Sequence, residues 1–424
     1  MLSRLNLLGS IRGLPRDLRL LFFSLFLWTF GLGVYNYVWS IYLTELHANP
    51  EQVGLVSSIG FMFAAISMIP GGVLANKYDA KTLLIVGWAM SIPAPILFYY
   101  SGTWSDVIPG LIILQLSAFN LPAMNVFIGE LADQRRISSS FGAVYSAAPL
   151  GLVLSPAVGG LLLNWLRIRD LFWFSLVLWI VSTLILFPLK SQPPREVDSK
   201  ARVFELPSSR QEMAILVFLF GATVAISISS PSFLPLYLQD HLHLIDSQVQ
   251  LMGAVQSLGS AFFTILLGRW ASTRNEGSTI AKELLLVAGG AAGIALAGSP
   301  LLAVPMVFLL GGARAPSPVA YSLLSKMRRG RSRAGQFGFY LTFEQLGFVL
   351  GSFFGGLLYA RNPANVFIIT FSLFPLLAAL CASQIRGVVP DSSKPNLNHE
   401  FRPELNLIGE VATKLDGEIL PVDG

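Results

Sequence analysis

Two charged side chains stand inside long apolar stretches of this sequence. Arg314 lies in LLGGARAPSPVAYSLL and Glu344 lies in FGFYLTFEQLGFVLGSFFGG. Each has roughly ten apolar or small residues on both sides, which at ~1.5 Å of helix per residue places it near the middle of a bilayer. An ionised side chain there costs at least about 2.5 kcal/mol on insertion scales, so it usually faces a partner, a water-filled cavity or a transport path. We therefore take Arg314 and Glu344 as the leading candidates for a functional site.

Two interpretations of this pair stay open. The residues lie on consecutive apolar segments at similar depth, so they could form a structural salt bridge that eases the burial of both. In the other interpretation, Arg314 binds an anionic group of a substrate and Glu344 carries a coupling proton, because an apolar environment favours the protonated form of a carboxyl.

The composition predicts the elements that hold these charges. The chain has 424 residues, of which 12% are charged, whereas a soluble domain has about 25%. Apolar runs of about 20 residues cross a membrane as helices, because a helix satisfies its own backbone hydrogen bonds. Twelve such segments cover residues 18–42, 52–75, 82–100, 106–129, 139–164, 170–189, 212–238, 248–271, 282–298, 301–325, 335–359 and 365–385. The predicted fold class is an all-α integral membrane protein with twelve transmembrane helices.

Polar segments and basic residues predict the domains and the topology. We expect a cytoplasmic N-terminus at 1–17, six-helix halves at 18–189 and 212–386, a cytoplasmic linker at 190–211, and a cytoplasmic, disordered tail at 387–424. Of the 29 Lys and Arg residues, only Arg167, Arg169 and Arg361 fall on the predicted outer loops, and Arg314 lies within a span. The positive-inside rule then places both termini in the cytoplasm. These basic residues meet anionic lipid, so we expect a bilayer and no nucleic acid as partner.

The two halves also resemble each other in sequence. The segment FGAVYSAAPLGLVLSPAVGGLLLNW from Phe141 aligns without a gap with FGFYLTFEQLGFVLGSFFGGLLYAR from Phe337, and at the same offset Gly72 aligns with Gly268. A parallel repeat of six helices is the architecture in which a transporter binds its substrate at the midplane between the halves. The duplication therefore favours alternating access over a channel or a membrane enzyme.

The loop after the second span carries a family resemblance. GGVLANKYDAKTLL is similar to the signature Gly-x-Leu-Ala-Asp-Arg-x-Gly-Arg-Arg of the major facilitator superfamily, and the chain resembles that family over residues 15–386. Gly72, Leu74, Ala75, Lys77 and Lys81 match, whereas Asn76 replaces the acid, Asp79 the second glycine and Ala80 an arginine. The resemblance implies two pseudo-repeats of six helices and a cytoplasmic gate formed by Gly72, Asn76, Lys77, Asp79 and Lys81. Because the family's acid latches this face, its loss implies a weak or rebuilt latch.

A second motif lies in the fifth span. Gly151-x-x-x-Ser155-Pro156-x-x-Gly159-Gly160 resembles the family's helix 5 "antiporter" motif, with Ser155 in place of a glycine. This motif is frequent in exporters, so the resemblance favours export. Gly151, Pro156, Gly347 and Gly351 are expected gating positions, and close helix packing alone is the other interpretation of these small residues.

Polar residues within the spans are candidates for substrate contacts. They are Tyr35 and Asn36 in the first span, Gln115 and Asn120 in the fourth, Gln256 in the eighth and Arg314 in the tenth, which lines the central cavity in the family. Gln115 stands nearest to the place where many proton-coupled drug exporters carry an arginine, which argues against drug efflux of that type. Hydrogen bonds between helices and interfacial aromatics are the alternative for these residues.

The sequence predicts a secondary transporter that exports a small organic compound and is coupled to protons. The chain has no Gly-Lys dipeptide, which a phosphate-binding loop needs, so bound ATP is not the expected driving force. We expect no cofactor, no metal, and a monomer in the plasma membrane. Uptake or facilitated diffusion of a sugar or carboxylate is one alternative. A membrane enzyme or lipid-handling protein is another, and it would need clustered His, Asp and Glu, whereas the four histidines lie apart.

The predicted topology has a direct test. Single cysteines at Ser199 and Asn365, in a Cys381→Ala background, should react with an impermeant thiol reagent from the cytoplasmic and outer side respectively, because the linker and the last outer loop face opposite sides. Labelling of sealed and inverted vesicles measures this, and reaction of both cysteines from one side would rule out the predicted division into six and six.

Overall fold

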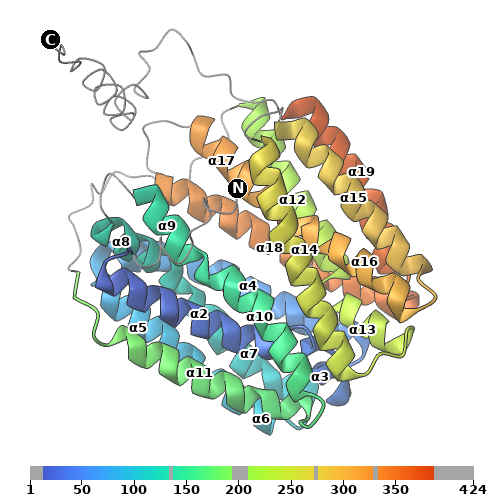
Figure 1. Ribbon diagram of the computed structural model, residues 1–424, viewed down its shortest axis with the longest axis horizontal. Helices are drawn as coiled ribbons and strands as arrows, with labels where there is room; N and C mark the ends of the chain where they lie inside the picture. The colour runs from blue at the N-terminus through green and yellow to red at the C-terminus, as the bar shows by residue number, and fades with distance from the viewer. Residues whose placement is uncertain (1–12, 133–136, 193–208, 272–275, 328–332, 386–424) are drawn as a thin grey trace, which may run out of the picture. The chain divides into compact units, whose positions relative to one another are not determined.

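The helices of this protein are long enough to span a membrane. The computed structural model describes residues 13–132, 137–192, 209–271, 276–327 and 333–385, and every element in these ranges is helical (Figure 1). Twelve helical stretches within them have the length and composition of membrane spans. The predicted fold class is confirmed. The tail at 387–424, most of the linker and most of the N-terminus lie outside the described residues, so the predicted domain boundaries stay predictions.

The elements of the N-terminal half follow each other in the order expected. They are α2 (Arg16–Asn36), α3 (Trp39–Glu45), α4 (Pro50–Lys77), α5 (Ala80–Ser91), α6 (Pro93–Tyr100), η2 (Trp104–Asp106), α7 (Val107–Leu116), η3 (Ser117–Asn120), α8 (Leu121–Leu131), α9 (Ile137–Tyr145), α10 (Ala147–Leu162), η5 (Ile168–Asp170) and α11 (Leu171–Leu186). The start of α4 is specified locally, since Asn49 and Gln52 exchange side chain–backbone hydrogen bonds of 2.9 Å in a capping box and Pro50 fills the first position.

The C-terminal half has fewer breaks but one that matters for the site. Its elements are α12 (Arg210–Ser229), α13 (Phe233–Asp240), α14 (Asp246–Ala271), α15 (Glu276–Leu296), α16 (Pro300–Gly311), η6 (Gly312–Arg314), α17 (Pro316–Met327), α18 (Arg333–Arg361) and α19 (Asn365–Gln384). The tenth span is therefore α16, the short 3₁₀ turn η6 and α17, and Arg314 lies in the turn.

Prolines lie where several spans divide into two helical elements. The helices α6 and α17 begin at Pro93 and Pro316, and α8 begins one residue before Pro122, although the residue before each of these helices keeps right-handed helical dihedrals. A proline has no N–H to donate to the preceding turn and is preferred in the first turn of a helix. Pro156 lies inside α10.

The glycine stripes pack helices of the same half against each other. A Cβ added to Gly151 of α10 would lie 2.3 Å from Thr29 Oγ1 of α2, and one added to Gly347 of α18 would lie 2.1 Å from Thr223 Oγ1 of α12. The helix α2 is the first span of the N-terminal half, and α12 is the first span of the C-terminal half. The repeat in the sequence therefore corresponds to the same helix–helix contact in both halves.

One turn further along, the two halves use the same contact with exchanged residues. In the N-terminal half Gly33 of α2 faces the Ser155 hydroxyl of α10, whereas in the C-terminal half Gly351 of α18 faces the Ser227 hydroxyl of α12. Each crossing therefore has one glycine and one serine, which keeps the helices close. The serine that replaces the motif glycine at position 155 is compensated by Gly33.

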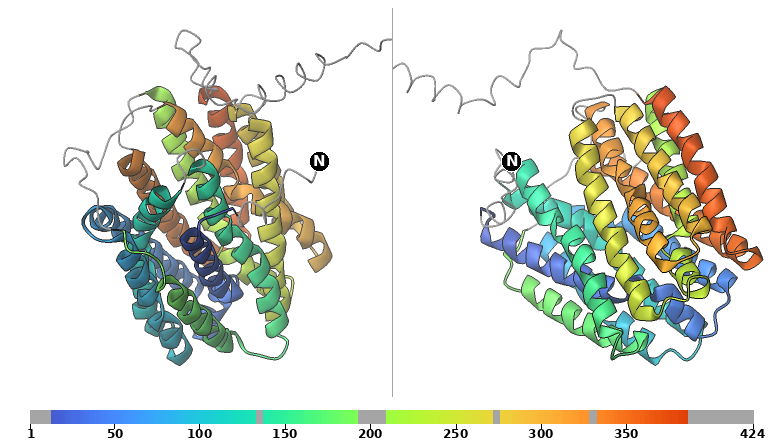
Figure 2. Two further views of the ribbon diagram at one scale, coloured as in Figure 1. Left: turned by 60° about the vertical axis from the view of Figure 1, so that its left-hand side comes forward. Right: turned by 45° about the vertical axis from the view of Figure 1, so that its right-hand side comes forward.

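At one end of the helices the two halves contact each other. Here α3 lies against α13, α10 against α14, and α4 against α18, and we call this the α3/α13 end (Figure 1). Figure 2 shows α10 in teal beside α14 in yellow. A Cβ on Gly160 would lie 2.9 Å from the Ser247 carbonyl, and one on Gly356 would lie 2.8 Å from the Pro50 carbonyl. These two contacts occupy aligned positions of the repeat.

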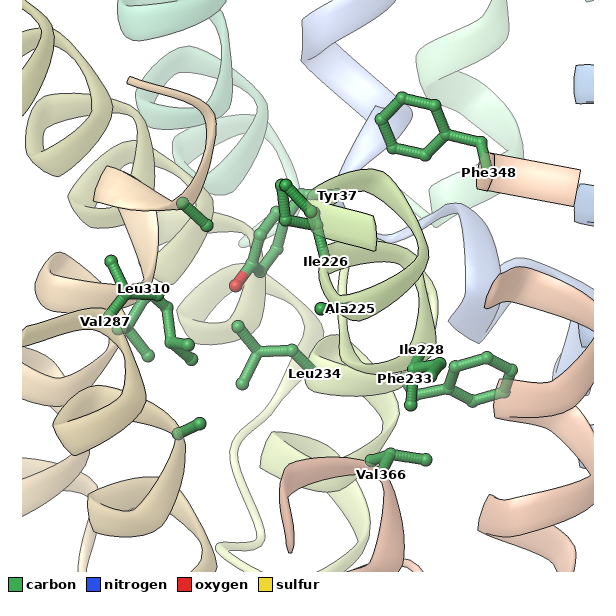
Figure 3. Packing of buried hydrophobic residues seen from close by; sticks show 14 of the residues in the cluster. Tyr37, Ala225, Ile226, Ile228, Phe233, Leu234, Val287, Leu310, Phe348 and Val366 are labelled. Atoms are coloured by element: carbon green, nitrogen blue, oxygen red, sulfur yellow. The ribbon is translucent and has the colours of Figure 1, made fainter. Parts of the chain in front are cut away.

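Hydrogen bonds and one tyrosine also join the halves at the α3/α13 end. Ser57 and Ser232 share a hydrogen bond of 2.9 Å. The Gln250 amide donates to the carbonyl oxygens of Gly33 and Val34 at 2.9 and 2.8 Å. The ring of Tyr37 lies in the buried core among side chains of the C-terminal half (Figure 3). At the other ends of α4 and α14, a Cβ on Gly72 or Gly268 would have open space around it.

The close helix crossings generate a prediction. Gly151→Leu and Gly347→Leu should each reduce transport strongly, because a large side chain would meet Thr29 or Thr223 where only a glycine fits. Transport in proteoliposomes at matched protein content measures this.

Leu152→Ala is the control, since Leu152 neighbours Gly151 on α10 and its truncation creates no clash. Normal transport by both leucine variants would mean that these crossings are not needed in the transport cycle.

Candidate functional site

Glu344 of α18 is held by two hydroxyl groups of α17. The Tyr321 hydroxyl donates to one carboxylate oxygen at 2.5 Å, and the Ser317 hydroxyl donates to the other at 3.2 Å. Ser317 and Tyr321 are one helical turn apart, so both project from the same face of α17. Glu344 is half-buried. Its charge is thus stabilised by neutral donors rather than by a cation in direct contact.

Arg314 lies in the turn η6, across from the same helix α18. Its guanidinium carbon lies 5.0 Å from the centre of the Phe348 ring, a cation–π distance. The Phe348 ring in turn stacks on Phe61 of α4 with centroids 4.9 Å apart and planes at 23°. Although it lies in the middle of a span, Arg314 is solvent-accessible. The arginine, two aromatic rings and both halves of the protein therefore meet at this place.

The two charged residues are neighbours but do not form an ion pair. The Arg314 guanidinium lies over the ring of Phe348, and Phe348 is one helical turn along α18 from Glu344. No salt bridge within 4.0 Å joins Arg314 and Glu344, both of which lie in the described part of the chain. The structural salt bridge between Arg314 and Glu344 is therefore not formed in this conformation, and each charge is left able to interact with a ligand.

The surroundings of Glu344 are compatible with both of its protonation states. An ionised Glu344 carboxylate accepts the hydrogen bonds from the Tyr321 and Ser317 hydroxyls. A hydroxyl is donor and acceptor alike and can rotate, so Ser317 can also accept a hydrogen bond from a protonated carboxyl. The site can consequently gain or lose a proton without leaving a buried polar group unpaired.

Gln256 lies close to the turn that carries Arg314. Its amide donates to the Ser230 hydroxyl at 3.1 Å, between α12 and α13. Its backbone carbonyl lies 2.1 Å from where a Cβ of Gly311 would be, immediately before η6. Gln256 therefore connects the breaks in the seventh and tenth spans, and its role in substrate binding stays a prediction.

The other predicted substrate residues lie in the N-terminal half. Tyr35 is 3% exposed, and its ring packs edge-on against the Phe172 ring with the centroids 5.0 Å apart. The Tyr35 hydroxyl has no hydrogen-bond partner in the described part of the chain. Asn120 is buried and its amide donates to the Ser117 carbonyl at 2.6 Å within η3. Asn36 is exposed and Gln115 is half-buried. No described contact joins these four to Arg314, so their role in binding stays a prediction.

The predicted gating loop after α4 is built around Asp79. Asp79 caps α5 by accepting from the backbone N–H of Thr82 at 3.0 Å and from its hydroxyl at 2.9 Å, and it also accepts from the backbone N–H of Gln192. Burial raises the pKa of Asp79, but the hydrogen bonds from Gln192 and Thr82 outweigh it and hold the pKa below its usual value. The aspartate that replaces the family's glycine thus ties this loop to the segment after α11.

The remaining gating candidates are placed as follows. Lys77 is exposed, Lys81 is half-buried, and the side chain of Asn76 lies outside the described residues. Gly72 has no close neighbour, and Pro156 is buried in α10. Gly151, Gly347 and Gly351 pack within their own halves. A gating role for these residues stays a prediction.

Sequence analysis missed Ser317, Tyr321 and Phe348. The signal was present in their spacing: Ser317 and Tyr321 follow Arg314 by three and seven residues on one helical face, and Phe348 follows Glu344 by four. The turn η6 made this spacing uninformative. A 3₁₀ turn has fewer residues per turn than an α-helix, so residues before and after it do not share a face at the spacing of a continuous helix.

Comparisons with known proteins place the chain among membrane transporters. The family model of the Major Facilitator Superfamily matches residues 21–244 and 213–414. Multidrug resistance protein MdtG of Klebsiella pneumoniae (strain 342) is 25% identical over 369 residues, 81% of this chain and 86% of that protein.

Solved structures show the same fold. That of the nucleoside transporter NupG has a TM-score of 0.71 at 14% identity and covers 88% of this chain and 100% of that one. That of a bacterial homolog of the human lysosomal transporter Spinster has a TM-score of 0.68 at 16% identity and covers 88% and 98%.

Proposed function

Because this chain belongs to the major facilitator superfamily, a family of membrane transporters, we propose that it is a proton-coupled secondary transporter that exports a small organic compound with an anionic group. The observation that carries this proposal is the state of Arg314. Arg314 is exposed within a span, its guanidinium lies over the Phe348 ring, and it forms no salt bridge with a described carboxylate. A cation in that position attracts a negatively charged group of a ligand, and the fork of the guanidinium suits a carboxylate or phosphate.

Glu344 is the proposed proton carrier. It is next to the proposed anion site but separate from it, and its partners Ser317 and Tyr321 are neutral. Desolvation favours its protonated form, whereas an approaching positive charge or water favours the ionised form. Uptake and release of a proton here changes the net charge beside Arg314, which couples proton binding to the binding of an anion.

Contacts between the halves support alternating access. They include the hydrogen bonds of Ser57 with Ser232 and of Gln250 with Gly33 and Val34 at the α3/α13 end. With both termini in the cytoplasm, this conformation is open toward the cytoplasm, in the plasma membrane. The motif around Gly151 and the likeness to a multidrug resistance protein support export. One chain contains both halves of the duplicated unit, so we propose that the monomer is the transporting unit.

Separate roles for the two charges predict different defects. Glu344→Gln mimics the protonated acid, so it should abolish proton-driven net transport yet retain exchange of substrate. Arg314→Ala should lose binding, by about 2–5 kcal/mol if a desolvated charge pair with substrate is broken. The substrate for both assays is a compound that raises the melting temperature of the purified protein in a ligand screen, since a bound ligand stabilises the folded state.

Arg361→Ala is the matched control for the arginine, because Arg361 is exposed at the end of α18. Proton-driven transport that survives in Glu344→Gln would contradict the coupling role and leave facilitated diffusion or uptake as the better description. Unchanged binding in Arg314→Ala would contradict the proposed anion site.

A further inference from the structure

Another charged residue lies inside a span, and its side chain has no hydrogen-bond partner among the described residues. Glu283 of α15 is 4% exposed, and neither of its carboxylate oxygens has a hydrogen-bond partner among the described residues. The adjacent Lys282 is exposed and points elsewhere. The predicted span began at residue 282 and put Glu283 at its edge, but α15 begins at Glu276, so Glu283 lies almost two turns inside.

The carboxyl group of Glu283 lies against the break in the tenth span. A Cβ on Gly312 of η6 would be 2.5 Å from Glu283 Oε1 and 2.9 Å from the ring of Phe263 on α14. A side chain at position 312 would displace the Glu283 carboxyl from this place. Gly312 is two residues before Arg314 in the same turn, so the buried acid and the proposed anion site share one short element.

The titratable groups on the neighbouring elements do not pair with Glu283. The elements packed against α15 are α14, α16, η6 and α19. They carry Asp246 and Arg269 on α14, Arg314 on η6 and Cys381 on α19, and α15 itself carries Glu276 and Lys282. The side chain of Arg269 lies outside the described residues, and none of the others forms a salt bridge with Glu283.

From this geometry we infer that Glu283 is a second proton-binding site of the transporter, protonated in this conformation and able to release its proton when η6 moves. An ionised carboxylate buried without a partner is far more costly than the neutral acid, which binds the proton on one oxygen. Displacement of Gly312 would admit water, or bring Arg314 toward the carboxylate, and either would stabilise the ionised form after the proton has left to water. This inference rests on the proposed function, because it adds a second proton to the cycle.

A proton is the ligand that fits this carboxyl. A resident cation such as Ca²⁺ takes six to eight oxygen ligands, and no group of three or more His, Cys, Asp or Glu side chains able to hold a metal occurs in the described ranges. A single buried carboxyl beside an apolar ring can bind one proton without further ligands.

Infrared difference spectroscopy tests the site without a substrate. Purified protein in lipid vesicles should show the C=O stretch of a protonated carboxyl at neutral pH that shifts in D₂O and disappears reversibly at alkaline pH. Glu283→Gln should abolish that band, whereas Glu276→Gln, on the same helix but at its start, should leave it unchanged. Glu344→Gln removes a different band, so failure of the proposed proton carrier is distinguished from failure of this site.

If Glu283→Gln does not fold, Glu283→Asp keeps the carboxyl and should shift the band instead of abolishing it. A spectrum of Glu283→Gln identical to that of the wild type would overturn the inference. So would a Glu283 band that responds neither to D₂O nor to pH, because that carboxyl would be permanently protonated and would take no part in proton exchange.

Discussion

An ionised side chain inside a membrane must be paired, hydrated or neutralised, and this requirement organises the centre of the protein. Arg314 is exposed and lies over an aromatic ring, Glu344 accepts from two hydroxyls, and the Glu283 carboxylate has no hydrogen-bond partner among the described residues. The three are gathered around one short turn, η6, and the helix α18. A direct ion pair would satisfy the first two groups but would also neutralise the charges that the proposed binding and coupling need. Leaving them unpaired is compatible with a site that exchanges ligands.

The frame around this centre is one helix arrangement built twice. The α2–α10 crossing repeats as the α12–α18 crossing, with glycine and serine exchanged between Gly33–Ser155 and Ser227–Gly351. Small residues allow backbones to approach closely in lipid, where packing rather than hydrophobic burial holds helices together. The adjacent glycines Gly160 and Gly356 contact the opposite half at the α3/α13 end.

The sequence sufficed for the twelve spans, the duplication and the two charges, because apolar length, basic loops and intramembrane charges have large energies that context does not override. It did not suffice for the partners of those charges. The 3₁₀ turn at Arg314 changes the register of the following face, so Tyr321 could not be assigned to Glu344 from spacing alone. Glu283 was missed because the charge of Lys282 put the predicted start of this span at residue 282. The helix α15 starts earlier, at Glu276, so Glu283 lies inside it.

The central claim is that Arg314 and Glu344 act separately, and a thermodynamic cycle on stability tests it most directly. The free energy of unfolding is measured in mixed micelles for the wild type, Arg314→Met, Glu344→Gln and the double variant. We expect a coupling energy well below that of a direct buried ion pair, since the two side chains form no salt bridge in this structure. A structural bridge would instead make each single variant lose roughly 3–5 kcal/mol, because it leaves a buried charge unpaired. Recovery of that loss in the double variant would contradict the separation of roles.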